Sequence, residues 1–124
     1  MPNPTQRYTG VPTEAEEQVR ICVWLRQRGI LFCHPPNEGR RSRVAGARLR
    51  MQGLSAGVPD LLIFDRAPLA PDVRGVALEV KRRKGGRVSP AQRSWLDGLT
   101  ARGWHAVVVR GADEAIAELT ALGY

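Results

Sequence analysis

The alternation of apolar and polar positions along the chain predicts an α/β domain. Helical periodicity begins after Thr13 and again after Ser89, and both residues are good N-caps with Glu or Gln three residues later. Short runs rich in Val, Ile and Leu, bounded by Gly, Pro or Asp, predict the strands. The expected elements are a helix over 14–28, strands over 30–34, 59–64 and 76–81, a helix from Pro90 to near Gly103, a strand over 104–109 and a helix over 112–122.

This order, αβββαβα, contains no internal repeat and indicates one domain over residues 13–124. Residues 1–12 contain three prolines and no periodicity, so we expect an extended arm there. Residues 35–57 are rich in Gly and Arg and predict mostly loop, with one helical turn near 47–52. A loop of this length in a compact domain is usually functional or disordered.

Two of the expected strands contain ionisable residues among apolar neighbours. Asp60 opens the strand in "GVPDLLIF", and Glu79 and Lys81 lie in the strand of "GVALEVKRRKGG". Burial of an unpaired charge is costly, so a strand that only has to pack would not contain these residues. Because side chains alternate along a strand, Glu79 and Lys81 share one face.

If the two strands are neighbours, Asp60 approaches Glu79, and two carboxylates at short range repel unless a cation lies between them. Oxygen ligands without added His or Cys suit Mg²⁺ or Mn²⁺. Lys81 beside such an ion can serve a water molecule or neutralise charge developing on a phosphate. The alternative is that Asp60 caps a turn while Glu79 and Lys81 form an ion pair on an edge strand.

The charge of the chain indicates a polyanionic partner. The formal net charge is +7, and arginine, whose planar fork suits phosphate oxygens, supplies most of the positive charge. Arginine codon bias in a GC-rich genome is the alternative source of this composition. The distribution favours function, because the basic residues form two clusters that flank the unusual strands. These clusters are Arg40, Arg41, Arg43, Arg48 and Arg50, and Arg82, Arg83, Lys84 and Arg87.

The remaining composition argues for an ordinary intracellular domain. The chain has no apolar run long enough to span a bilayer, and its start lacks the apolar core of a signal peptide. We therefore expect a cytoplasmic protein that does not enter a membrane. Cys22 and Cys33 have no metal-binding spacing and predict buried free thiols. His34 and His105 have no partners in the pattern, so neither indicates a zinc site.

Two segments together resemble the virus-type replication-repair nuclease (VRR-NUC) domain of the PD-(D/E)XK nuclease superfamily. They are "GVPDLLIF" and "ALEVKRRKGGRVSPAQRSWLDGLTARGWHAVVV". Members share a Gly-x-Pro-Asp strand start, a strand ending in Glu-x-Lys, and a helix entry matched here by Gly86, Ser89, Gln92 and Trp95. The likeness covers nearly the whole chain from Thr13, including "TEAEEQ" and "HPPNEGRR".

The resemblance implies a restriction-endonuclease-like αβββαβ core with a C-terminal helix, and a Mg²⁺- or Mn²⁺-dependent DNA endonuclease. It implies metal ligands at Asp60, Glu79 and the backbone carbonyl of Val80, with Lys81 serving the attacking water. Gln92 would contact the site or the DNA, or complete the capping box with the residue at the helix start. Both roles of Gln92 can hold together.

The superfamily usually adds a glutamate from the first helix, and three acids compete for this role. Advancing about 100° per residue places Glu14 in line with Gln18 and the apolar stripe, with Glu17 to its side and Glu16 pointing away. The family's Glu-x-x-x-Gln start agrees with Glu14 and Gln18. The alternative is that all three acids complement the helix dipole.

Stand-alone domains of this kind look like endonucleases of branched or junction DNA that act in replication, repair or phage DNA processing. We expect such a role in a bacterial or phage-infected cell. A four-way junction has two symmetric scissile strands, which makes a homodimer attractive. The leading alternative is a non-catalytic DNA-binding protein that has kept the nuclease fold. A second alternative is an interaction protein whose arginines are merely solvated.

Overall fold

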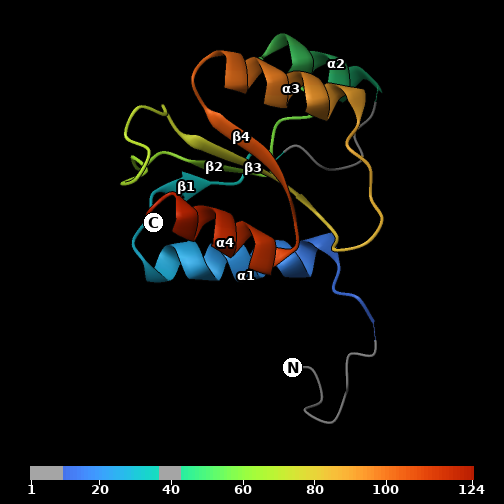
Figure 1. Cartoon of the computed structure of the whole chain (residues 1–124). Helices are drawn as coiled ribbons and strands as arrows, with labels where there is room; N and C mark the ends of the chain where they lie inside the picture. The colour runs from blue at the N-terminus through green and yellow to red at the C-terminus, as the bar shows by residue number, and fades with distance from the viewer. Residues whose placement is uncertain (1–9, 37–42) are drawn as a thin grey trace.

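A four-stranded mixed sheet lies between two layers of helices in the computed structural model, which describes residues 10–36 and 43–124 (Figure 1). Helices α1 and α4 cover one face of the sheet, and α3 and α2 lie on the other side. The elements are α1 (Glu14–Gln27), β1 (Phe32–Cys33), α2 (Arg43–Met51), β2 (Leu61–Ile63), β3 (Val76–Lys81), α3 (Pro90–Ala101), β4 (His105–Arg110) and α4 (Ala112–Ala121). The α/β class and the predicted order are confirmed, with α2 added.

The predicted helix starts are those of the structure. The Thr13 hydroxyl accepts a hydrogen bond from the Glu16 N–H and begins α1. Ser89 and Gln92 form a reciprocal capping box at the start of α3. Most of the predicted N-terminal arm lies outside the described residues, and so do Arg40 and Arg41.

The strands follow the order β1-β2-β3-β4. β1 pairs with β2, and β2 with β3, in antiparallel fashion, whereas β3 and β4 are parallel and are joined through α3. Leu61 lies opposite Leu78, and Ile63 opposite Val76. One further step of this register brings Asp60 opposite Glu79, so the neighbouring strands expected from the sequence are present.

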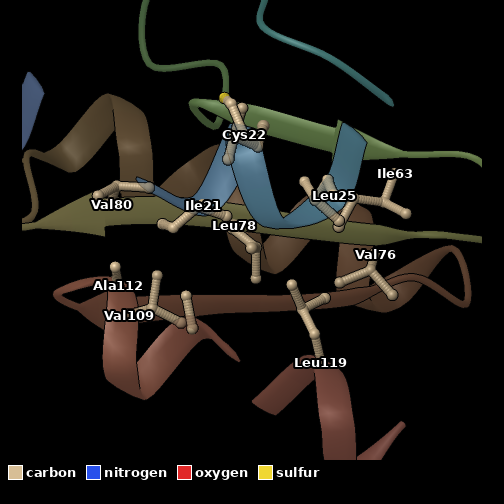
Figure 2. Packing of buried hydrophobic residues seen from close by; sticks show 12 residues of the cluster. Ile21, Cys22, Leu25, Ile63, Val76, Leu78, Val80, Val109, Ala112 and Leu119 are labelled. Atoms are coloured by element: carbon tan, nitrogen blue, oxygen red, sulfur yellow. The ribbon is translucent and has the colours of Figure 1, made fainter. Parts of the chain in front are cut away.

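The main core lies between the sheet and the layer of α1 and α4 (Figure 2). Val76, Leu78 and Val80 project from β3 into this core, where Leu25 from α1 and Leu119 from α4 are fully buried. Since neighbouring side chains of a strand point to opposite faces, the alternate residues of β3 face α3. The core therefore fixes the strand whose other face carries the ionisable pair.

Helix α2 corrects the prediction of a loop with a single helical turn over 35–57. It extends over nine residues, "RVAGARLRM", and none of them is buried. Arg, Ala, Leu and Met have high intrinsic helix propensity, and together they outweigh the one glycine, Gly46. The Gly- and Arg-rich composition was therefore misleading, because it hid a strong local preference for helix.

Two smaller expectations can be compared with the structure. Both cysteines are free, but only Cys22 is buried and Cys33 is exposed, so the prediction of burial is wrong for Cys33. Within residues 10–36 and 43–124, no helix has the length and apolar character needed to cross a bilayer.

Candidate active site

Four element ends meet at one edge of the sheet. β2 begins there, β3 ends there, and the N-termini of α1 and α3 approach from the two helical layers, on the right-hand side of Figure 1. The ionisable residues singled out in the sequence lie at these ends. Asp60 directly precedes β2, Glu79 and Lys81 are near the end of β3, and Gln92 is in the first turn of α3.

Asp60 is held in place by the neighbouring strand. Its Oδ2 accepts a hydrogen bond of 2.8 Å from the backbone N–H of Val80, and the residue is half-buried. This contact joins two of the residues that the family resemblance implied as metal ligands. It also fixes the carboxylate against the end of β3, directly beside the position of Glu79.

Glu79 is buried and only partly satisfied. It is 2% exposed, its Oε1 lies 3.4 Å from Lys81 Nζ, and its Oε2 has no hydrogen-bond partner among the described residues. Burial, and then the negative charge of Asp60, raise the pKa of Glu79 to about 7 although Lys81 opposes the shift. A buried carboxylate oxygen without a donor is unfavourable, and a cation would satisfy it.

Lys81 is 6% exposed and is oriented by two side chains. Besides its ion pair with Glu79, its Nζ donates a hydrogen bond of 3.1 Å to Gln92 Oε1. The same Gln92 oxygen accepts the Ser89 N–H at 2.9 Å as part of the capping box. Gln92 therefore caps α3 and contacts Lys81 through the same oxygen atom.

The residues at this edge fit a hard divalent cation. Asp60 and Glu79 supply adjacent carboxylate oxygens, and Glu79 Oε2 is buried without a partner in residues 10–36 and 43–124. Oxygen-only ligands suit Mg²⁺ or Mn²⁺, which keep several water ligands. No three side chains of His, Cys, Asp or Glu within the described ranges converge to hold a metal alone. Further ligands would thus come from the backbone, water or phosphate.

The helical phase predicted for α1 is wrong. The buried residues of α1 are Glu17, Ile21, Cys22 and Leu25, whereas Glu14 is exposed. α1 packs against α4, and this turns Glu17 rather than Glu14 inward. Glu14 nevertheless faces the site, because it lines the same hollow as Asp60, and its charge adds a smaller upward contribution to the pKa of Glu79.

Glu17, in α1, contacts both the start of α4 and the segment that follows β3. Its Oε2 accepts the Ala112 N–H at the start of α4 at 2.6 Å, and its Oε1 lies 3.3 Å from Arg83 Nη2. Gly111 has a φ of +92°, and a side chain there would overlap the Glu17 carboxylate. The Gly111 N–H in turn donates to the Lys81 carbonyl. Arg83, predicted to bind DNA, is thus engaged in a structural ion pair.

The other described residues of the two basic clusters are exposed. One basic cluster lies on α2, which has no acidic residue in its first turn, and the other lies in the segment after β3. The segment between α2 and β2 is fixed against α3, because Trp95 donates to the Ser55 hydroxyl and Gly57, with φ +86°, abuts the backbone of Ala91. The exposed members are Arg43, Arg48, Arg50, Arg82, Lys84 and Arg87.

His34 is a site residue that the sequence pattern did not reveal. Its Nδ1 lies 2.6 Å from the backbone carbonyl oxygen of Asp60. It lines two hollows, of about 400 and 240 Å³, that both reach Asp60: one beside α1 and one beside the start of α3. Its partner is a backbone atom distant in sequence, so only its position after a short strand could have hinted at this role.

Comparisons with known proteins agree with this geometry. The family model of the VRR-NUC domain matches residues 12–113. A solved structure described as a VRR_NUC domain protein superposes with a TM-score of 0.75 at 24% identity, covering 92% of this chain and 90% of that chain, which shows a shared fold. No curated protein matches the sequence.

Proposed function

This chain belongs to the VRR-NUC domain family, whose members are nuclease-type DNA-processing domains, and from that premise we propose that it is a Mg²⁺- or Mn²⁺-dependent DNA endonuclease. The observation that carries the proposal is the buried Glu79 oxygen that has no hydrogen-bond partner within the part of the chain that the structure describes, beside Asp60 and Lys81. A purely structural ion pair would not leave that oxygen unsatisfied next to a second carboxylate.

The chemistry follows from what each side chain can do. Asp60 and Glu79, with the Val80 carbonyl, would hold the metal ion, which when bound supplies a Lewis acid for the phosphate and a more acidic water. Lys81, held by Gln92, can orient the attacking water or neutralise the charge that develops on the phosphate. Hydrolysis forms a bond from the water oxygen to phosphorus and breaks the bond to one ester oxygen, which leaves with a proton.

The basic surface supports DNA as the polymer bound. Exposed arginines on α2 and basic residues after β3 lie on segments that lead directly to Asp60 and away from Lys81. Contacts to phosphates position a protein on DNA without reading its sequence. We extend the proposal to branched or junction DNA and to a homodimer, since a junction presents two equivalent strands and a two-fold dimer presents two equivalent sites.

A panel of linear duplex, flap and four-way DNAs tests this function, with wild-type protein and the Lys81→Ala variant compared in Mg²⁺. We expect wild type to cut branched DNA fastest, and Lys81→Ala to bind nearly normally but to cut poorly. Binding by both proteins without cleavage would favour the non-catalytic alternative. Sedimentation of the protein with and without the junction tests the homodimer.

A further inference from the structure

The hollow of about 400 Å³ beside α1 has a lining that differs from that of a phosphate site. Ala15, Val19 and Cys22 form an apolar wall along one side of α1. Burial raises the pKa of the Cys22 thiol, which agrees with low polarity at this wall. Glu14 and Asp60 also line this hollow. A phosphate would meet the like charge of these two carboxylates beside an apolar wall, so the hollow suits an uncharged, largely apolar group.

The hollow on the other side of His34 has the opposite character. It is smaller, about 240 Å³, and is lined by Ser89 and Gln92 at the start of α3. Gln92 contacts Lys81, and the basic segment after β3 leads into this helix. A backbone phosphate therefore fits the α3 side of Asp60 better than the α1 side.

The polar groups around the hollow beside α1 can bind the edge of a planar ring. Gln18 offers an amide that both donates and accepts, and Arg26 is held with its guanidinium 5.4 Å from the centre of the Phe32 ring. Amide and guanidinium side chains are common partners of base edges. The volume is within the range of about 300–1,000 Å³ that is usual for pockets of small organic ligands.

We propose that this hollow holds one unpaired nucleobase of the DNA, next to the phosphate that lies at Asp60 and Glu79. This inference rests on the proposed nuclease function and names the feature of the substrate that the site selects. A paired base would have to leave its stack to enter, at a cost of a few kcal/mol, whereas a base at a branch is already free. The hollow would therefore favour branched DNA over continuous duplex without reading sequence.

Filling the hollow tests the inference, and α1 offers a matched control. Val19 lines the hollow and is 61% exposed, and Val23, one turn further along, is 46% exposed and does not line it. Val19→Trp should occupy the space of the base, whereas Val23→Trp changes the same helix by the same side chain. Ala15→Trp on the same wall is a second filling variant.

The measurement is the Kd for two flap DNAs in EDTA, by fluorescence anisotropy, with either a base or an abasic residue at the unpaired position beside the branch. Wild type and Val23→Trp should bind the base-containing DNA roughly fivefold to tenfold more tightly. Val19→Trp and Ala15→Trp should bind both DNAs alike.

Three other results overturn the inference, and only the last of them also overturns the proposed nuclease function. If wild type binds both DNAs equally but cuts DNA in Mg²⁺, or if both filling variants retain the preference, the hollow does not take a base and the nuclease function stands. If no DNA is bound or cut, the proposed function fails and the inference fails with it.

Discussion

At the scale of single residues, Glu79 is the most informative side chain. Its pKa is raised to about 7, from an ordinary value of 4.5, first by burial and then by Asp60. Near neutral pH it is therefore divided between a protonated form and a charged form that the surroundings penalise. A divalent cation would remove this penalty, because it would displace the proton and satisfy the Oε2 atom, for which the described residues offer no hydrogen-bond donor.

The stability of the metal-free protein should consequently fall as pH rises. A carboxylate with a raised pKa stabilises the fold fully below pH 4.5, and that contribution is lost as pH rises towards 7 and beyond. We expect the difference in Tm between wild type and Glu79→Gln to change by about 5 °C between pH 5 and 8 in EDTA. Thermal unfolding is measured for both proteins, because both contain the same histidines and the difference in Tm reports on Glu79 alone. A difference in Tm that does not change with pH would contradict the raised pKa of Glu79.

Glu14 and Glu17, both in α1, should differ in their effects on turnover and on stability. Glu14 is exposed beside the site, and Glu17 is fully buried in contact with Arg83 and the start of α4. Glu14→Gln should lose most of its turnover at saturating DNA and keep its stability. Glu17→Gln should be destabilised, by about 3 kcal/mol, and keep its turnover while folded.

Urea unfolding and cleavage rates, measured on both variants, test this assignment. Glu16→Gln is the control, since Glu16 is exposed and its N–H, not its carboxylate, makes the contact with Thr13. Loss of turnover in a stable Glu17→Gln protein would mean that the buried acid serves the reaction, and unaffected turnover in Glu14→Gln would mean that α1 supplies no acid.

At the scale of elements, α3 connects local structure with the site through one oxygen atom. Gln92 Oε1 accepts both the Ser89 N–H and Lys81 Nζ. Ser89→Ala removes the hydrogen bond from the Gln92 N–H to the Ser89 hydroxyl and leaves the contact between Gln92 and Lys81 in place. Gln92→Ala removes both the cap hydrogen bond to the Ser89 N–H and the contact with Lys81. Both variants should lose about 1 kcal/mol of unfolding free energy, but only Gln92→Ala should also cut DNA more slowly. Equal cleavage rates would reduce Gln92 to a capping residue.

Features set by periodicity within one element could be predicted from the sequence, whereas contacts between elements distant along the chain mostly could not. The period of two placed Glu79 and Lys81 on one face, and neighbouring strands then brought Asp60 to them. The phase of α1 could not be chosen, because an acid at either of two positions continues the apolar stripe and only the packing of α4 selects Glu17. His34 depends on a backbone carbonyl that the fold brings near, and no periodicity encodes such a contact.

At the scale of the whole molecule, the positive charge is distributed unevenly along the fold. α2 is a helix without buried residues that carries Arg43, Arg48 and Arg50. Packing does not hold these side chains, so they are available to phosphates. By contrast, Arg74 lies just before β3, and Lys81 is at the other end of that strand, so this arginine is far from the site.

Replacing the α2 arginines by Ala should weaken DNA binding and flatten its salt dependence together. Each lost phosphate contact lowers the slope of log K against log salt by about 0.9 on duplex DNA. The control replaces three exposed arginines outside both clusters, with the same change in net charge: Arg66, Arg74 and Arg102. A salt titration in which both triple variants show the same slope would mean that α2 makes no specific contribution.

The most direct test of the central claim is the initial rate of DNA cleavage as a function of Mg²⁺ concentration, for wild type and Glu79→Gln. If Asp60, Glu79 and Lys81 form a metal-dependent hydrolytic site, wild type is inactive in EDTA and its rate rises to saturation with Mg²⁺. Glu79→Gln, which keeps the shape of the side chain but loses its charge, should be slower by a factor of about 100 or more. Cleavage by wild type in EDTA, or an unchanged rate in Glu79→Gln, would contradict the account.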